Sequence, residues 1–391
     1  MLKPHAATIA ATTPPPVMEA RRWLDGVNIP PERPLLNLSQ AAPVAPPPPE
    51  LRKALAAAVE DDSSHLYGPV LGLPALRTEL AARWSQQYGG QIAPNDVAIT
   101  SGCNQAFAAA MSTIAAAGEA VILPVPWYFN HKMWLDMQGI ETIPLPCGAG
   151  MLPDLAKAEA VITPKTRAIV LVSPNNPTGA EYPPDLLAGF VALARKYALA
   201  LVVDETYRDF HAQPHPVHTL FADENWRDVL VHLYSFSKVF RLTGHRVGAL
   251  VASPARLAEA EKFLDTVAIC PNQLGQRAAL FGLQNLQGFI AEERAETLRR
   301  RTVVEAGFAA LPGWRLLCCG AYFAYAQYDM EIDSPTLAQR LVAEASLLVL
   351  PGTMFAPHGT QSAKRQLRIA FANANTQELA VLFARLAAFA P

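Results

Sequence analysis

Six short runs of nearly continuous apolar residues constrain the fold of this chain more than any other feature. They are residues 96–100, 119–123, 168–172, 200–204, 229–235 and 248–252. The runs do not alternate apolar with polar residues, which is typical of strands buried on both faces. Helical patterns lie between several of them, for example from Pro183 onward. The sequence therefore predicts an α/β fold, with a mostly parallel sheet between layers of helices.

The length of 391 residues exceeds the usual size of one domain, and the 51% apolar content is enough for a large core. After about residue 265, longer helical patterns and two strand-like pieces suggest a second, α+β unit. We therefore expect residues 1–50 to form an N-terminal arm and part of a small domain. Residues 51–265 are expected to form the large domain with the sheet, and residues 266–391 the small C-terminal domain.

Charge and cysteine usage argue against several classes of protein. The net charge of −2 provides no basic surface for nucleic acid or an anionic membrane. The apolar helical run 106–117 is too short to span a bilayer. The five cysteines show neither a disulfide framework nor zinc spacing. His211, His215 and His218 lie among prolines and lack a supporting metal-ligand pattern. With no apolar signal core at the start, we expect a cytoplasmic protein without a metal site.

Polar residues gather where the predicted strands end. In open α/β sheets, ligands bind beyond the carboxyl ends of the strands. Four of the predicted strands are followed by residues able to bind a ligand: SPNNPTG at 173–179, Asp204 with Tyr207, Ser235 and Ser237 with Lys238, and SGCNQAF at 101–107. Gly102 in the last segment precedes a predicted helix, whose N-terminus is a natural phosphate site. Arg246 follows Lys238 by eight residues.

Each of these features alone has an ordinary structural explanation. NNPTG is a good β-turn, a single aspartate at a strand end is more often a cap, and a single lysine is usually solvated. Together and in this order, they suit an enzyme that uses pyridoxal phosphate. A lysine forms a Schiff base with the cofactor aldehyde, and a buried carboxylate keeps the pyridine nitrogen protonated. An amide and a phenol contact the ring oxygen, while helix N–H groups, hydroxyls and an arginine hold the phosphate.

The segments SPNNPTG, DETY and SFSKVFRLTGHRVG together resemble the class I and II aminotransferases, the fold-type I pyridoxal-phosphate family typified by aspartate aminotransferase. The similarity runs in order from LNLSQAAP, at residue 36, to LRIAFAN, at residue 367. Ser-x-Ser-Lys followed by the arginine is highly specific for the family, and NNPTG is moderately so. The resemblance implies a large cofactor-binding domain, built on a seven-stranded, mostly parallel sheet, and a smaller α+β domain.

The resemblance also implies a role for individual residues around the cofactor. Lys238 resembles the Schiff-base lysine, and Asp204 the partner of the pyridine nitrogen, supported by His131. The contacts to the ring oxygen would be Tyr207 and Asn176. The phosphate ligands would be Ser235, Ser237, Arg246 and the turn Gly102–Cys103–Asn104. Tyr128 resembles the aromatic residue that stacks on the ring, with Trp127 as the candidate if the alignment slips by one.

Substrate recognition and assembly follow from the same resemblance. Arg368 would bind the substrate α-carboxylate through a bidentate contact. Tyr67 would reach the phosphate of a neighbouring subunit, so a homodimer with shared active sites is implied. Ala41 stands where the substrate loop of the family often has glycine, and its methyl group could narrow the pocket. Aspartate-specific members use a second arginine for the distal carboxylate, and residues 266–275 contain none; neutral or aromatic donors are therefore favoured.

The leading interpretation is an aminotransferase that moves an amino group from an L-amino acid to a 2-oxo acid. A β-eliminating carbon–sulfur lyase on the same scaffold is the alternative, because both reactions share their first steps and the cofactor residues do not separate them. The effector domain of a transcription regulator is a third possibility. It would need a DNA-binding module, and the 50-residue arm is short, proline-rich and not strongly basic.

Overall fold

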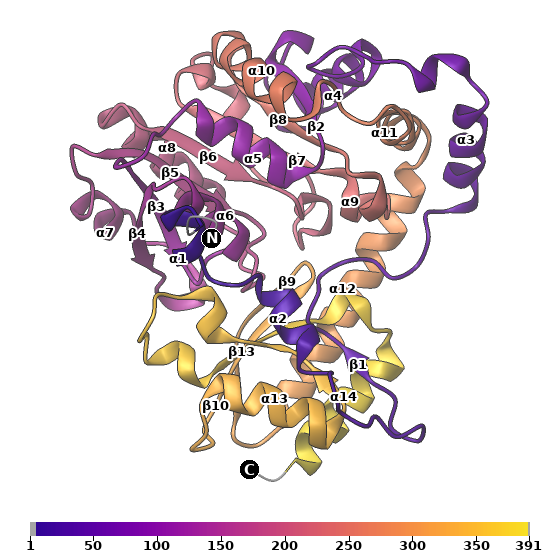
Figure 1. Cartoon of the computed structure of the whole chain (residues 1–391), viewed down its shortest axis with the longest axis vertical. Helices are drawn as coiled ribbons and strands as arrows, with labels where there is room; N and C mark the ends of the chain where they lie inside the picture. Colours follow the sequence, from indigo (N-terminus) through magenta and orange to yellow (C-terminus); the bar gives the residue numbers. More distant parts are fainter. Residues whose placement is uncertain (1–4, 390–391) are drawn as a thin grey trace.

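The computed structural model describes residues 5–389, and a seven-stranded sheet forms its centre (Figure 1). The strand order is β2-β8-β7-β6-β5-β3-β4. The strands are β2 (Val97–Thr100), β3 (Ala120–Val125), β4 (Glu141–Pro146), β5 (Thr166–Val172), β6 (Ala200–Asp204), β7 (Leu230–Ser235) and β8 (Gly248–Val251). Only β8 runs antiparallel to its neighbours, β2 and β7. All six apolar runs are strands of this sheet, which confirms the α/β fold.

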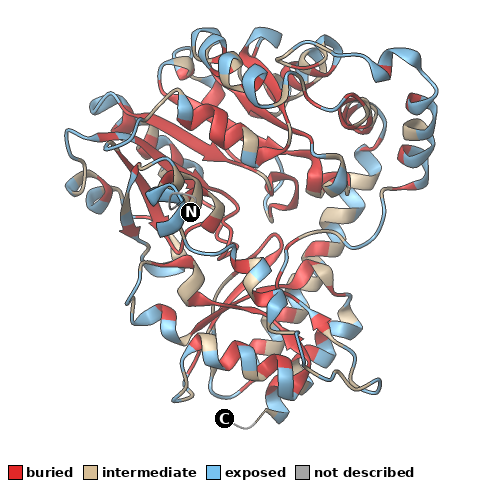
Figure 2. Cartoon of the chain, viewed as in Figure 1, coloured by how far each residue is buried: buried red, intermediate tan, exposed pale blue. Residues whose placement is uncertain are grey.

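Successive side chains of the strands point to opposite faces, and each face has its own core. On one face, α4 (Pro74–Tyr88), α8 (Pro184–Lys196) and α11 (Gln273–Asn285) pack on residues such as Ile169 and Val203. On the other face, α5 (Cys103–Ser112), α6 (Phe129–Met137) and α10 (Pro254–Ala268) pack on Val170 and Val202. Figure 2 shows the resulting band of buried strands between half-exposed helices. Burial on both faces explains why the runs are continuously apolar.

The sequence interpretation missed the edge strand β4. Most of its residues are exposed or half-buried, and Pro144 and Pro146 interrupt the pattern. Proline cannot donate to a sheet and is tolerated at an edge, where one side of the strand has no partner. A strand that is exposed and contains prolines has no apolar run by which to recognise it.

A second sheet lies in the lower half of Figure 1 and is antiparallel. Its order is β12-β13-β10-β9, and the strands are β9 (Trp314–Gly320), β10 (Phe323–Tyr328), β12 (Leu350–Pro351) and β13 (Gln366–Ala370). Three helices share its apolar core: α12 (Gln287–Ala309), α13 (Ser334–Ala345) and α14 (Thr376–Ala388). The N-terminal arm contains α1 (Ala7–Ala11), α2 (Pro16–Arg22) and β1 (Leu36–Asn37). β1 pairs with β11 (Leu347–Leu348), so the arm reaches this second unit.

The division expected after residue 265 falls inside helix α10. This helix packs in the core of the central sheet, and the next helix, α11, packs on α4 and on α3 (Pro49–Val59). No glycine or internal proline breaks α10 near Asp265, so the sequence pattern gave no physical reason for a boundary there. We propose instead that the boundary lies within α12, the helix that joins α11 to β9. Among residues 5–389, none of the helices is both long and apolar enough to cross a membrane.

Candidate active site

A pocket of about 230 Å³ lies at the carboxyl ends of β5, β6 and β7. These three strands are adjacent and parallel, so residues that follow them in sequence converge at one edge of the sheet. The structure brings ten of the predicted residues into this pocket: Cys103, Asn104, Tyr128, Asn176, Asp204, Tyr207, Ser235, Ser237, Lys238 and Arg246. The convergence was expected from strand order and is observed in the fold.

Lys238 lies on the short helix α9 (Phe236–Val239), immediately after β7. Its Nζ is 5.9 Å from the centre of the Tyr207 ring. Burial lowers the pKa of the Lys238 amine to about 8, and the nearby cations Arg246 and Arg368 act in the same direction. The amine is therefore partly neutral, and hence nucleophilic, near physiological pH.

Asp204 ends β6 and is almost completely buried. Its Oδ2 lies 3.2 Å from His131 Nε2, and its Oδ1 accepts the backbone N–H of Thr206 at 2.9 Å. Burial alone would raise the pKa of this carboxyl, but His131 and Thr206 outweigh burial and lower the pKa below its usual value. Asp204 therefore remains an anion at the base of the pocket. His131 is held by stacking on Phe107, with ring centres 3.9 Å apart.

Of the two aromatic candidates, Tyr128 and Trp127, only Tyr128 lines this pocket. Tyr128 lines the pocket and packs edge-on against His131, whereas Trp127 lies outside it and lines a different cavity. Tyr207 lies on the next segment after Asp204, and burial raises the pKa of its phenol well above 10. The Tyr207 phenol consequently keeps its proton and is a hydrogen-bond donor toward the pocket.

The turn from β2 into α5 forms a small cradle whose groups suit an anion. Gly102, the N-cap of α5, has a φ of +86°, a conformation that favours glycine. A Cβ at Gly102 would lie 2.3 Å from Nη2 of Arg246. Arg246 Nη1 donates to the Thr243 carbonyl at 2.9 Å and reaches Ser237 Oγ at 3.4 Å. The free N–H groups of the first turn of α5, a hydroxyl and a guanidinium thus face the same small space.

Arg368 comes from β13 of the second unit and is 1% exposed. Its Nη1 donates to Asn176 Oδ1 at 3.1 Å, and its Nη2 donates to the Ser39 carbonyl. Within the described part of the chain, its Nε has no hydrogen-bond partner. Burial lowers the pKa of Arg368 to about 10, so the guanidinium stays charged at neutral pH. The link to Asn176 joins the two units at the pocket.

The structure does not place Ala41 and Tyr67 among the residues that line the pocket. Ala41 packs in a small cluster with Tyr207, Tyr322 and Phe323, next to the pocket wall. Tyr67 is 81% exposed, so within a single chain its ring projects into solvent.

Four residues that line the pocket were not selected from the sequence: Gln40, Asn130, Val172 and Thr206. Asn130, Val172 and Thr206 stand directly beside His131, the segment SPNNPTG and Tyr207, which the sequence had already singled out, and that position was the available signal. Asn130 Nδ2 donates to the Tyr128 hydroxyl at 2.8 Å. Gln40 Oε1 accepts a hydrogen bond from Arg21 Nη2 at 2.7 Å, which brings helix α2 to the mouth of the pocket.

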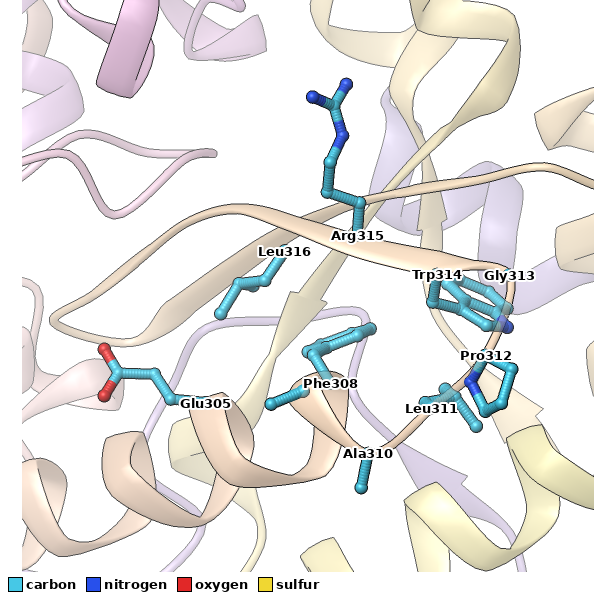
Figure 3. Close-up of a pocket in the computed structure, with 10 residues that line it drawn as sticks. Glu305, Phe308, Ala310, Leu311, Pro312, Gly313, Trp314, Arg315 and Leu316 are labelled. Atoms are coloured by element: carbon cyan, nitrogen blue, oxygen red, sulfur yellow. The ribbon is translucent and has the colours of Figure 1, made fainter.

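Another hollow lies between the end of α12 and the start of β9 and is bordered by Phe308, Leu311 and Trp314 (Figure 3). It shares no residue with the pocket around Lys238. Its stick view shows mostly apolar side chains together with the carboxylate of Glu305 and the guanidinium of Arg315, which point away from each other, so the convergent polar groups that a catalytic site needs are not seen there.

Comparisons with known proteins agree with the geometry. The family model for aminotransferase class I and II matches residues 33–386. The chain is 30% identical to the valine–pyruvate aminotransferase of Mycobacterium tuberculosis over an alignment of 331 residues that covers 82% of this chain and 83% of that protein. It is 29% identical to the aspartate/prephenate aminotransferase of Thermus thermophilus over an alignment of 376 residues that covers 92% of this chain and 90% of that protein.

Solved structures show the same similarity in three dimensions. A single mutant of the Thermus thermophilus aspartate aminotransferase superposes with a TM-score of 0.89 at 25% identity, covering 99% of both chains. Substrate-bound BacF of Bacillus subtilis superposes with a TM-score of 0.88 at 25% identity, covering 99% of this chain and 98% of that one.

Proposed function

This chain belongs to the class I and II aminotransferases, and on that premise we propose which of its residues bind the cofactor and which substrates it accepts. It is a pyridoxal-phosphate-dependent transaminase of fold type I. Its relatives are named as aminotransferases, so the carbon–sulfur lyase is not favoured. The observation that supports the residue assignment best is the convergence of Lys238, Asp204 and the Gly102 cradle in one pocket.

The donor set of the pocket fits pyridoxal 5'-phosphate. The cradle at Gly102 and Arg246 suits a dianionic phosphate, and it is separate from the amine of Lys238. Asp204 provides a buried anion for the pyridine nitrogen, and Tyr207 and Asn176 provide donors for the ring oxygen. When bound, the cofactor supplies an aldehyde that links covalently to amines and a ring that accepts electrons from the substrate Cα.

The side chains then perform separate tasks. Lys238 Nζ would hold the cofactor covalently before substrate arrives. As a free amine it would then take the Cα proton of the amino donor and, in the second half of the reaction, deliver a proton to Cα of the amino acid formed from the oxo acid. Asp204, kept anionic by His131, stabilises the protonated ring nitrogen. Arg368 binds the substrate α-carboxylate through its free Nε and an Nη group. The phosphate is held by Ser235, Ser237, Arg246 and the N–H groups of the Gly102–Cys103–Asn104 turn.

We propose a neutral or aromatic L-amino acid as donor and a 2-oxo acid as acceptor. Residues 266–275 contain no arginine for a distal carboxylate, and aromatic rings of Tyr207, Tyr322 and Phe210 pack beside Ala41. The exposed Tyr67 supports a homodimer in which it reaches the partner's phosphate. The five cysteines are free thiols, which supports our proposal of a cytoplasmic protein.

A panel of amino donors tests this function. The cofactor-loaded protein is incubated with each L-amino acid and a 2-oxo acid, and the transferred amino group is measured by chromatography. Neutral or aromatic donors should react faster than aspartate, and Lys238→Ala should be inactive with all of them. Pyruvate and ammonia released from a cystathionine-like donor, without amino transfer from any donor, would instead establish the lyase.

A further inference from the structure

A cluster of ionisable and aromatic side chains is buried directly behind the pocket. We name it the Glu205 cluster, and it consists of Tyr88, Glu205, Arg208, Asp209, His232 and Tyr234. Each of these side chains is 9% exposed or less. None of them lines the pocket, and the proposed chemistry uses none of them.

The carboxylate of Glu205 links three separate segments. Its Oε2 lies 2.8 Å from Nε2 of His232 on β7 and accepts the hydroxyl of Tyr88 at the end of α4. Its Oε1 lies 3.2 Å from Nε2 of His218. Burial raises the pKa of Glu205, but the facing imidazoles of His218 and His232 outweigh burial and hold the pKa well below its usual range. The carboxylate is therefore an ionised group that is hydrogen-bonded to Tyr88 and His232 and lies beside the imidazole of His218.

The neighbouring residues Arg208 and Asp209 extend these links. Arg208 is 1% exposed, stacks on the Tyr88 ring at 4.5 Å and donates to Gln87 on α4 at 2.6 Å. Asp209 accepts the hydroxyl of Tyr234 on β7 at 2.6 Å. Buried charges are costly unless they are paired or hydrogen-bonded, so this arrangement determines the conformation of the segment 205–209 closely.

The residues of the Glu205 cluster are direct neighbours in sequence of residues that line the pocket. Glu205 directly follows Asp204, and Arg208 directly follows Tyr207. On β7, Tyr234 directly precedes Ser235, and the strand leads within three residues to Lys238. At the ends of β6 and β7, neighbouring side chains point to opposite sides, so Asp204 and Ser235 line the pocket while Glu205 and Tyr234 belong to the cluster. Further along, the chain turns into a short 3-10 helix (Arg208–Phe210), and there Tyr207 lines the pocket while Arg208 packs on Tyr88.

We propose that the Glu205 cluster positions the site: it fixes the turn after β6, and with it Asp204 and Tyr207, against the end of β7 that leads to Lys238. Glu205, Arg208 and Asp209 are thus positioning residues, which act on the cofactor through their neighbours. This inference rests on the proposed roles of Asp204 and Tyr207.

Glu205→Gln tests the proposal, with Asp96→Asn as the matched control. Glutamine preserves the shape of the side chain but replaces one carboxylate oxygen by an NH2 group. This group cannot accept the hydrogen bonds that Tyr88 and His232 make to the carboxylate. Asp96 is also fully buried and accepts Arg227 Nε at 2.8 Å, but it precedes β2 at the opposite end of the strands from the pocket. Both variants should lose thermal stability.

Cofactor readouts separate positioning from simple loss of stability. For Glu205→Gln, the Kd of the apoprotein for pyridoxal phosphate should rise at least tenfold, and the visible circular dichroism of the bound cofactor should change. For Asp96→Asn, both should match wild type. A Glu205→Gln protein with wild-type Kd and dichroism would overturn the proposal.

Tyr234→Phe decides the question if Glu205→Gln does not fold. It removes only the hydroxyl that donates to Asp209, and we expect a Kd about threefold above wild type together with altered dichroism. Unchanged values would overturn the proposal. Wild-type protein that fails to bind pyridoxal phosphate would instead contradict the proposed function, so the two failures are distinguishable.

Discussion

Lys238 shows how the neighbours of a side chain prepare it for chemistry. Burial and the cations Arg246 and Arg368 all disfavour the ammonium form, so the pKa of the amine falls to about 8. At pH 7 about a tenth of the amine is then neutral, roughly two hundred times more than for an unperturbed lysine.

The titration of Lys238 in the apoprotein should therefore be displaced. Reductive methylation followed by peptide mapping should give a midpoint near pH 8 for Lys238, because the charged form is the one that burial penalises. The same peptide in denaturant should titrate near pH 10.4 and provides the reference. Equal midpoints in the folded and denatured protein would show that the pocket does not perturb the amine.

Asp204→Asn should remove most of the catalytic power without emptying the site. The amide carries no charge to stabilise a protonated ring nitrogen, and we expect kcat to fall at least a hundredfold, about 2.7 kcal/mol in the barrier. Cofactor content, measured by absorbance, should stay close to that of wild type because the phosphate cradle is intact. Near-normal exchange of the substrate Cα proton in the loaded variant would contradict the role of Asp204.

The site residues that were predictable stand in local motifs. Asp204, Tyr207, Ser235 and Lys238 follow strands whose order places them together, so one strand assignment predicts their proximity. Gln40 was missed because its place in the pocket depends on the arm folding back, held by the contact of Arg21 with Gln40. A contact between residues 19 positions apart, on a proline-rich arm, leaves no periodic pattern in the sequence.

At the scale of elements, the turn before α5 is the most restrictive local structure of the site. Gly102 has a φ of +86°, and a Cβ there would occupy the space of Arg246 Nη2. Gly102→Ala should therefore both strain the backbone by about 1–3 kcal/mol and displace the phosphate-binding guanidinium. We expect the Kd for pyridoxal phosphate, measured by fluorescence quenching, to rise at least tenfold.

Gly118→Ala is the matched control for this change. Gly118 has a φ of +84°, but a Cβ there would meet no atom within 4 Å. It should lose a similar amount of stability while its affinity for the cofactor stays that of wild type. Equal affinities for the two variants would argue against a phosphate site at this turn.

Strands could be predicted from the sequence where all of their residues are buried, and could not where only some of them are. The six buried strands were recognised from composition alone, whereas the edge strand β4 was missed because exposure and two prolines removed the signal. We propose a boundary within α12 in place of the one at residue 265, and partial burial explains why the sequence carries no signal for it. Helices α10 and α11 resemble other amphipathic helices, and the side of the molecule on which they pack is decided by tertiary contacts.

At the scale of the whole molecule, each site is proposed to borrow one residue from a second chain. Lys238→Ala mixed with Tyr67→Ala should regain activity after subunit exchange, because one site of the hybrid dimer combines Lys238 of one chain with Tyr67 of the other. Lys238→Ala mixed with Arg368→Ala should regain none, since Arg368 already bonds to Asn176 of the same pocket within one chain. The activity of each variant measured by itself is the baseline.

Two results would contradict the shared site. One is rescue by the Arg368→Ala variant. The other is the absence of rescue by a Tyr67→Ala variant that is defective alone and is shown to exchange subunits.

The assignment of Lys238 as the covalent attachment point of the cofactor is the central claim, and chemical trapping tests it most directly. The protein is loaded with pyridoxal phosphate, reduced with borohydride and digested, and the pyridoxyl group is located by mass spectrometry. We predict that the group is found on the peptide that contains Lys238 and that prior incubation with an amino donor prevents the labelling. Attachment to any other lysine, such as Lys132 or Lys262, would contradict the account.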